Sequence, residues 1–123
     1  MNIINESIPI YARIAEGIKD RILSGDFKEG EQLPSTTQIS KEFDINISTV
    51  NRAVNVLVSE GVAFKKRGIG MFVADGAVER LIDERRKMFR ENYIQATLVE
   101  AKRLRYSVED LQTMVAEIYK KIS

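Results

Sequence analysis

The stretch PSTTQISKEFDINISTVNRAVNVLV, residues Pro34–Val58, decides the fold, because it contains two helix starts separated by a short turn. The first helix begins with a capping-box pattern at Ser35–Gln38 and is expected to end near Phe43. The second begins after Asn46, a residue type that caps helix N-termini. Two helices joined by the tight connection 44–46 predict a helix-turn-helix.

The second helix of this pair has two chemically different faces. Its inner face is apolar, and its outer face is polar, without acidic residues. The inner residues are Val50, Ala53, Val54, Leu57 and Val58, and the outer ones include Ile47, Ser48, Asn51, Arg52 and Asn55. Ser, Thr, Asn and Arg read base edges and phosphates in the major groove of DNA, whereas carboxylates are repelled there. The alternative is an ordinary αα-hairpin whose polar face is solvated.

Local charge favours the groove-reading interpretation. The whole chain has 19 Lys and Arg against 18 Asp and Glu, so its bulk charge does not indicate a polyanion partner. Residues 1–45 hold five basic and eight acidic residues, whereas residues 46–74 hold four basic residues and one acid. The positive charge therefore coincides with the second helix and the segment that follows it.

An amphipathic helix and a hairpin flank the helix-turn-helix. Ile10, Ile14, Ile18 and Ile22 recur every four residues, so a helix is expected from an N-cap at Ser7 to a stop at Gly25. A polar connection, residues 26–32, follows it. After Gly61, the short apolar runs 62–64 and 71–73 flank a turn and predict a β-hairpin.

The hairpin tip, KKRGIG at residues 65–70, concentrates three cations. Glycines in hairpins commonly serve backbone geometry, which is the simpler explanation for Gly68 and Gly70. Adjacent cations repel one another unless a polyanion is nearby, which favours a wing that contacts phosphates or the minor groove. A nucleotide-binding glycine loop fits poorly, because no helix start follows Gly70.

Composition excludes several classes of protein. The 123 residues contain no His, Cys or Trp, so a zinc cluster, a Ser-His-Asp triad and a Cys nucleophile are all absent. Paired acids in a cleft are not evident either, and we expect neither an enzyme nor a metal or other cofactor. The chain shows neither a signal peptide nor the roughly 20 apolar residues of a membrane span, so we expect a cytoplasmic protein.

The remaining residues, 76–123, predict two more amphipathic helices, one near 77–104 and one capped by Ser107 with Asp110. Two helices alone cannot bury both apolar stripes, so they need a partner surface. We expect them to pair with a second copy; folding back onto the helix-turn-helix is the alternative. The expected dimerisation residues are Val78, Leu81, Ile82, Phe89, Tyr93, Ala96, Leu111, Val115 and Ile118. The basic cluster Arg85–Lys87 with Arg90 is interpreted as a solvated face paired with Glu84 and Glu91.

The predicted fold class is therefore mainly α with a small β-hairpin. A winged helix-turn-helix DNA-binding domain is expected over residues 1–75, followed by a two-helix C-terminal dimerisation element over residues 76–123. The expected DNA contacts lie at both helix starts, on the outer face and in the hairpin. They are Ser35, Thr36, Thr37, Asn46, Ile47, Ser48, Thr49, Asn51, Arg52, Lys66, Arg67, Gly68 and Gly70.

Four motifs carry a family resemblance: PIYARI (9–14), SGDFKEGEQLPST (24–36), STVNRA (48–53) and GVAFKKRGIGMFV (61–73). In this order they resemble the winged helix-turn-helix domain of the GntR family of bacterial transcription regulators, over residues 8–75. The resemblance implies a homodimer on a short inverted repeat, with the third helix in the major groove and the wing tip at the minor groove. The short helical tail resembles the YtrA-type subfamily, which implies repression.

The chain departs from the family pattern at two positions. Family members usually have arginine at the positions of Thr37 and Ile47. Because a bidentate arginine discriminates between bases by about 1 to 3 kcal/mol, we expect a different, AT-richer operator, with Thr37 donating to a phosphate and Ile47 packing on a thymine methyl.

Two questions stay open at the level of sequence. A winged-helix module that binds protein instead of DNA is the alternative function. No residue pattern identifies a pocket for a small-molecule effector, and the short tail leaves room for one only between subunits.

Overall fold

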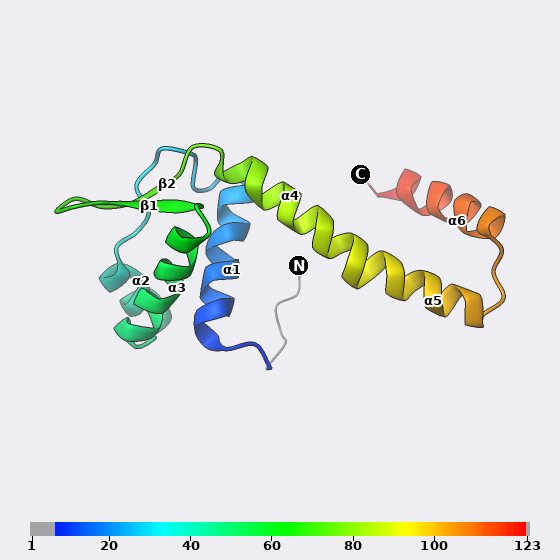
Figure 1. Ribbon diagram of the computed structural model, residues 1–123, viewed down its shortest axis with the longest axis horizontal. Helices are drawn as coiled ribbons and strands as arrows, with labels where there is room; N and C mark the ends of the chain where they lie inside the picture. The colour runs from blue at the N-terminus through cyan, green and yellow to red at the C-terminus, as the bar shows by residue number, and fades with distance from the viewer. Residues whose placement is uncertain (1–6, 123) are drawn as a thin grey trace. The chain divides into compact units, whose positions relative to one another are not determined.

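The computed structural model describes residues 7–122, which divide into two compact units, one ending at Glu84 and the other beginning at Arg85. The N-terminal unit contains α1 (Ile10–Leu23), α2 (Thr36–Phe43), α3 (Ile47–Ser59), β1 (Ala63–Lys66), β2 (Gly70–Val73) and the first turns of α4 (Ala77–Phe89), as Figure 1 shows. The C-terminal unit contains the end of α4, a π-helical turn (Arg90–Ile94), α5 (Gln95–Arg103) and α6 (Val108–Lys121). The predicted fold class is confirmed.

The core of the N-terminal unit is built around α3. The helices α1 and α2 and the strand β1 all contact this helix. Its inner residues Val50, Ala53 and Leu57 are fully buried, as the sequence periodicity predicted. The other buried apolar residues of this core are Ala15, Ile18, Ile22, Leu33, Ile39, Val54, Val62, Ala63, Met71, Val73, Ala77 and Leu81.

The β-hairpin is longer toward its tip than the sequence predicted. β1 and β2 are antiparallel, and the register pairs Ala63 with Val73 and Lys66 with Gly70, so the turn is reduced to residues 67–69. We call the hairpin Ala63–Val73 the wing. The sequence predicted the strands from the apolar runs 62–64 and 71–73. Lys65 and Lys66 are charged and lie outside these runs, but they belong to β1.

A third extended segment, residues 31–33, pairs with β2. The sequence predicted only a polar connection at residues 26–32. The amide of Leu33 donates to the carbonyl of Met71 at 2.8 Å, and the amide of Val73 donates to the carbonyl of Glu31 at 2.9 Å. Gln32 forms a β-bridge with Phe72. The segment is too short to show the period-two alternation that reveals a strand in sequence.

The start of α1 differs from the expectation that Ser7 is its N-cap. The N-cap is Pro9, which has extended backbone and makes no side-chain cap. Its carbonyl accepts hydrogen bonds from the amides of Ala12 at 3.0 Å and Arg13 at 3.2 Å. Proline has no amide to leave unpaired at a helix start, so it can take this position without a capping side chain.

The first turns of α4 belong to the N-terminal unit. The Glu29 carboxylate accepts hydrogen bonds from the amides of Gly76 and Val78, both at 3.0 Å, and so caps the helix from a distant loop. These backbone hydrogen bonds lower the pKa of Glu29. The Arg80 guanidinium donates to the carbonyl of Gly61 at 2.6 Å, at the end of α3. Three long-range hydrogen bonds therefore hold the start of α4 in place.

Two residues of α4 that were expected to pair with a second copy pack within the N-terminal unit. Leu81 is 0% exposed inside the N-terminal core, and Val78 packs partly buried against that core. Neither residue is therefore available as an exposed dimerisation side chain. For the same reason the first compact unit runs to Glu84 and not to the expected boundary at residue 75.

A buried lysine connects three helices of the N-terminal unit. Lys19 in α1 is 3% exposed, and its ammonium lies 2.5 Å from the carboxylate of Glu60, the C-cap of α3. Glu16 and Glu84 each lie 3.6 Å from the same ammonium. Burial lowers the pKa of Lys19, but the hydrogen bond to Glu60 and the three negative charges outweigh it, so the pKa is raised. Glu84 thus faces Lys19, where the sequence suggested a role in the basic cluster of α4.

The C-terminal unit is helical. The expected helix near 77–104 is present as residues 77–103, with the π-helical turn that periodicity did not predict. The capping box of Ser107 and Asp110 at the start of α6 is confirmed. Within residues 7–122 no helix is both long and apolar enough to cross a membrane.

Candidate DNA-binding surface

The corner between α2 and α3 is held by local hydrogen bonds. The amide of Gln38 donates to the hydroxyl of Ser35 at 3.0 Å, and the amide of Ser35 donates to the Gln38 side chain at 2.8 Å, which completes the predicted capping box. Asp44 ends α2 in the left-handed conformation with φ 52°. The hydroxyl of Ser40 donates to the carbonyl of Ile45 across the turn. These contacts set the angle at which α3 leaves the corner.

Asn46 caps α3, as the sequence predicted. Its side-chain oxygen accepts hydrogen bonds from both the amide and the hydroxyl of Ser48, each at 2.9 Å. Ile47, Ser48 and Asn51 are exposed, and Thr49 is half-buried. The first two turns of α3 therefore present a small polar surface with one aliphatic side chain, and no acidic side chain lies in the first turn. Such a helix start fits the major groove.

Arg52 lies on the outer face, but α1 holds its side chain. The guanidinium carbon lies 3.9 Å from the centroid of the Tyr11 ring, a stacked cation-π contact. The residue is exposed, so its charge still adds to the positive potential of this surface. Because its guanidinium already stacks on the Tyr11 ring, a phosphate contact is favoured over a bidentate base contact.

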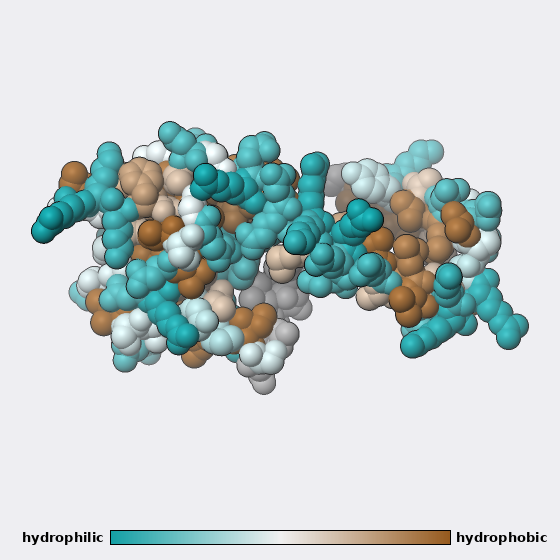
Figure 2. All heavy atoms as spheres, in the orientation of Figure 1, coloured by the Kyte–Doolittle hydropathy of each residue, from teal (hydrophilic) through white to brown (hydrophobic). Residues whose placement is uncertain are grey.

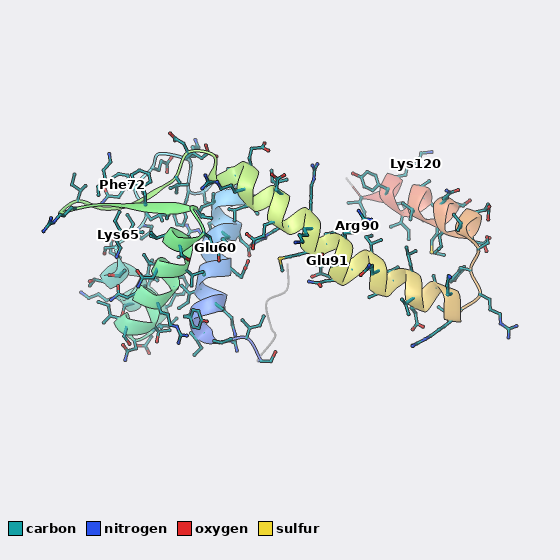
Figure 3. The ribbon with its side chains drawn as sticks, in the orientation of Figure 1. Glu60, Lys65, Phe72, Arg90, Glu91 and Lys120 are labelled. Carbon is teal, nitrogen blue, oxygen red and sulfur yellow. The ribbon has the colours of Figure 1, made fainter. Side chains whose placement is uncertain are left out.

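The wing presents its cations on both faces. Phe64 and Phe72 form a cross-strand pair with stacked rings 5.7 Å apart, and the Lys66 ammonium lies 4.7 Å from the Phe72 ring. Lys65 pairs with Met71 on the opposite face, and Figure 3 shows Lys65 and Phe72 on opposite sides of the hairpin. Because successive strand residues alternate in direction, the charges flank the tip from two sides.

A groove between the wing, the start of α2 and the middle of α3 brings most of the predicted contacts together. We call it the wing groove. Seven predicted DNA contacts line it, namely Ser35, Thr36, Asn51, Lys66, Arg67, Gly68 and Gly70. The other predicted contacts, namely Thr37, Asn46, Ile47, Ser48, Thr49 and Arg52, lie outside its lining.

Six residues that were not predicted as DNA contacts also line the wing groove. Leu33, Val54 and Met71 belong to the buried core, whereas Gln32, Lys65 and Ile69 are exposed. Gln32 comes from the third extended segment, and its side-chain amide donates to the carbonyl of Ile69 at 3.1 Å. That contact joins residues 37 positions apart, so no local pattern reveals it. Lys65 could have been included, since it belongs to the same cationic run as Lys66 and Arg67.

The C-terminal unit shows a different kind of surface. Of the residues expected to pair with a second copy, Phe89, Tyr93, Ala96, Val115 and Ile118 are exposed, and Leu111 is half-buried. One open apolar hollow is lined by Leu98 of α5 and by apolar residues of α6, among them Val108, Leu111, Val115 and Tyr119. Figure 2 shows hydrophobic side chains gathered over this unit. The described residues include no group of three or more His, Cys, Asp or Glu that could hold a metal ion.

A helix-turn-helix, a β-wing and a polar, cationic groove between them are the parts of a winged helix-turn-helix DNA-binding protein. Residues 10–73 match the family described as bacterial regulatory proteins, gntR family. The chain belongs to the GntR family of bacterial regulatory proteins, and the resemblance drawn from its motifs is confirmed.

Known relatives and structures agree with this assignment. The chain is 29% identical over 112 residues to the HTH-type transcriptional repressor YtrA of Bacillus subtilis (strain 168), covering 91% of this chain and 85% of YtrA. A crystal structure of a GntR-family protein from Bacteroides thetaiotaomicron has a TM-score of 0.79 and 31% identity, covering 94% of this chain and 100% of that one. The DNA-binding domain of AraR in complex with operator ORE1 has a TM-score of 0.53 and 30% identity, covering 55% of this chain and 82% of that one.

Proposed function

We propose that the chain is a transcriptional repressor that binds an inverted-repeat operator as a homodimer. The wing groove carries this proposal, because it gathers polar side chains of α2 and α3 and the cations of the wing on one surface. The start of α3 enters the major groove, where Asn51 and the side chains around Ser48 reach base edges. The wing lies at the adjacent minor groove, and Lys65, Lys66 and Arg67 contact phosphates.

Repression and operator binding are supported by similarity. YtrA is a repressor, and the likeness to it covers nearly the whole of both chains. The AraR domain is similar in fold over the winged part and was crystallised with its operator. Dimerisation is supported by the exposed apolar residues of α5 and α6, which a single chain leaves in water.

The departures at Thr37 and Ile47 bear on the operator sequence. Both side chains are exposed, and neither can make the bidentate guanine contact of an arginine. Ile47 has the shape to pack on a thymine methyl at the N-terminus of α3. The operator should therefore differ from the common half-site of the family and contain more A·T pairs.

Selection from a random DNA pool with the full chain, at two salt concentrations, tests this function. We expect an enriched inverted repeat whose binding weakens steeply with salt, because each phosphate contact releases counterions. Enrichment of the common GntR half-site would contradict the interpretation of Thr37 and Ile47. No enrichment at either salt concentration would contradict the proposal and favour a module that binds protein.

Two variants test the division of labour on the surface. Arg67→Glu should weaken binding to all sequences and reduce the salt slope, because it removes a phosphate contact. Asn51→Ala should change the selected sequence more than it changes the affinity for random DNA. Equal effects of both variants on operator and random DNA would contradict the assigned roles.

A further inference from the structure

The tip of the wing exposes an aliphatic side chain among cations. Ile69 is 63% exposed, the largest exposed fraction among the large hydrophobic residues recorded as exposed in the described part of the N-terminal unit. It follows the cations Lys65, Lys66 and Arg67 after Gly68, and it does not belong to the buried core cluster of the unit. An aliphatic side chain at the end of a polar loop leaves apolar surface in water, which is unfavourable, and it contributes nothing to the buried core.

Two hydrogen bonds hold the backbone of Ile69 in place. Its amide donates to the carbonyl of Lys66 at 3.0 Å across the turn. Its carbonyl accepts the Gln32 side-chain amide at 3.1 Å, from the third extended segment. Gly68 has φ 77° and Gly70 has φ 145°, conformations that favour glycine. These contacts therefore hold the backbone of Ile69 at the tip.

Gly70 makes room for the Gln32 contact. A Cβ atom at Gly70 would lie 2.6 Å from the Gln32 side-chain nitrogen, so the Gln32 side chain would have to shift to accommodate it. Any larger residue would push Gln32 away from the carbonyl of Ile69. The Gln32 contact thus supports the Ile69 backbone, while the Ile69 side chain stays largely exposed.

We propose that Ile69 enters the minor groove and makes the protein select A·T pairs at the wing position by excluding guanine. The proposal rests on the proposed placement of the wing at the minor groove. An A·T pair leaves the groove floor without a projecting group, so an isoleucine fits against it. A G·C pair places the guanine 2-amino group there, and an aliphatic side chain both clashes with this donor and leaves it without an acceptor.

A second aliphatic residue could also produce a preference for A·T pairs, but in the other groove. Ile47, at the start of α3, is placed to read the thymine methyl in the major groove. The two effects differ in the chemical group of the base that is recognised. Ile69 responds to the 2-amino group of guanine, whereas Ile47 responds to the 5-methyl group of thymine.

Base analogues separate these two atoms. The operator obtained by selection is prepared with single pairs replaced in turn, at the major-groove contacts and at the positions flanking them, by G·C, inosine·C or A·uracil. Inosine·C keeps the major-groove edge of G·C but lacks the 2-amino group, and A·uracil lacks only the thymine methyl. Affinities of the full chain are measured by competition anisotropy at fixed salt.

At the wing position we expect G·C to weaken binding about tenfold, as a typical mismatched pair does. Inosine·C should restore the affinity to within about twofold of A·T, and A·uracil should leave it unchanged, because only the minor-groove amino group matters there. Weak binding of inosine·C, equal to that of G·C, would overturn the proposal, as would the absence of any position with this pattern.

The variant Ile69→Ser removes the aliphatic group from a largely exposed position outside the buried core, so the fold is retained. It should bind A·T and G·C operators within about twofold of each other and keep the wild-type salt slope. Ile47→Ser is the matched control, which should keep the inosine rescue and lose the response to uracil. An undiminished G·C penalty in Ile69→Ser would overturn the proposal while operator selection by the wild type still supported the proposed function.

Discussion

Leu57 in α3 is 0% exposed, whereas Ile118 in α6 is 53% exposed, although both belong to apolar stripes of similar regularity. The N-terminal unit buries apolar residues from α1, α2, α3, the wing and α4 in one cluster. In the described part of the C-terminal unit, Ala101 is the buried apolar residue. Equal amphipathic patterns thus have different outcomes, because the first unit has several layers to pack together and the second has only helices with one apolar side each.

The comparison teaches that the two units have different requirements for stability. The N-terminal unit satisfies its own apolar surface and contains the candidate DNA-binding groove. The C-terminal unit leaves an apolar surface that a second copy can cover. The following predictions test this difference, in order of decreasing expected effect.

Leu57→Ala should destabilise the N-terminal unit by about 3 kcal/mol, because it leaves a cavity at a fully buried site. Urea unfolding followed by circular dichroism measures the free energy of unfolding. Ile69→Ala is the control, since it removes aliphatic groups from an exposed site of the same unit and should change that free energy by less than about 0.5 kcal/mol. Equal losses in both variants would contradict the assignment of the core.

Ile118→Asp should convert the dimer to a monomer, because it places a charge in the apolar surface of α6. Loss of the second half-site contact should weaken operator binding about a hundredfold, or about 2.7 kcal/mol. Sedimentation equilibrium and operator titration measure the two effects. Thr113→Asp adds the same charge on the polar face of α6 and should remain dimeric; identical masses for the two variants would exclude this surface.

Lys19→Met should destabilise the N-terminal unit by about 2 kcal/mol, because it leaves the carboxylates of Glu16, Glu60 and Glu84 without their cation. In the double variant Lys19→Met/Glu60→Gln the loss should be smaller than the sum of the two single losses. The double-mutant cycle is measured by urea unfolding. Additive losses would show that this contact does not couple α1 to the end of α3.

Glu29→Gln should have the smallest effect, and the effect should depend on pH. The Gly76 and Val78 amides lower the pKa of Glu29, so its stabilisation is complete above the ordinary value of 4.5 and is lost as the pH falls through the lowered pKa. Melting temperatures of wild type and variant should therefore differ at pH 7 and converge as the pH falls from 4.5 through the lowered pKa. For Glu31→Gln, an exposed neighbour on the same segment, no such convergence is expected.

The sequence predicted those structural features that depend on residues close together in the chain. The capping boxes at Ser35 and Ser107, the Asn46 cap and the inner face of α3 involve residues within a few positions of each other, so their physics is visible in order and spacing. The wing cations and the exposed polar face of α3 were predicted for the same reason.

Contacts between distant residues could not be predicted in this way. Glu29 caps α4 across 47 positions, and Lys19 meets Glu60 across 41. Burial of Leu81 in the N-terminal core depends on the direction in which α4 starts, which that distant cap sets. Ile69 was not predicted, because the exposure of an aliphatic side chain and the long-range support of its backbone are not visible in a local sequence pattern.

We propose that a self-sufficient DNA-reading unit is brought to DNA in pairs by a C-terminal unit that is incomplete alone. Native mass spectrometry of the full chain bound to the selected operator tests it most directly, because it counts chains per duplex. We predict two chains on the intact inverted repeat, and one chain for Ile118→Asp at the same protein concentration. A single wild-type chain on the intact repeat would contradict the claim.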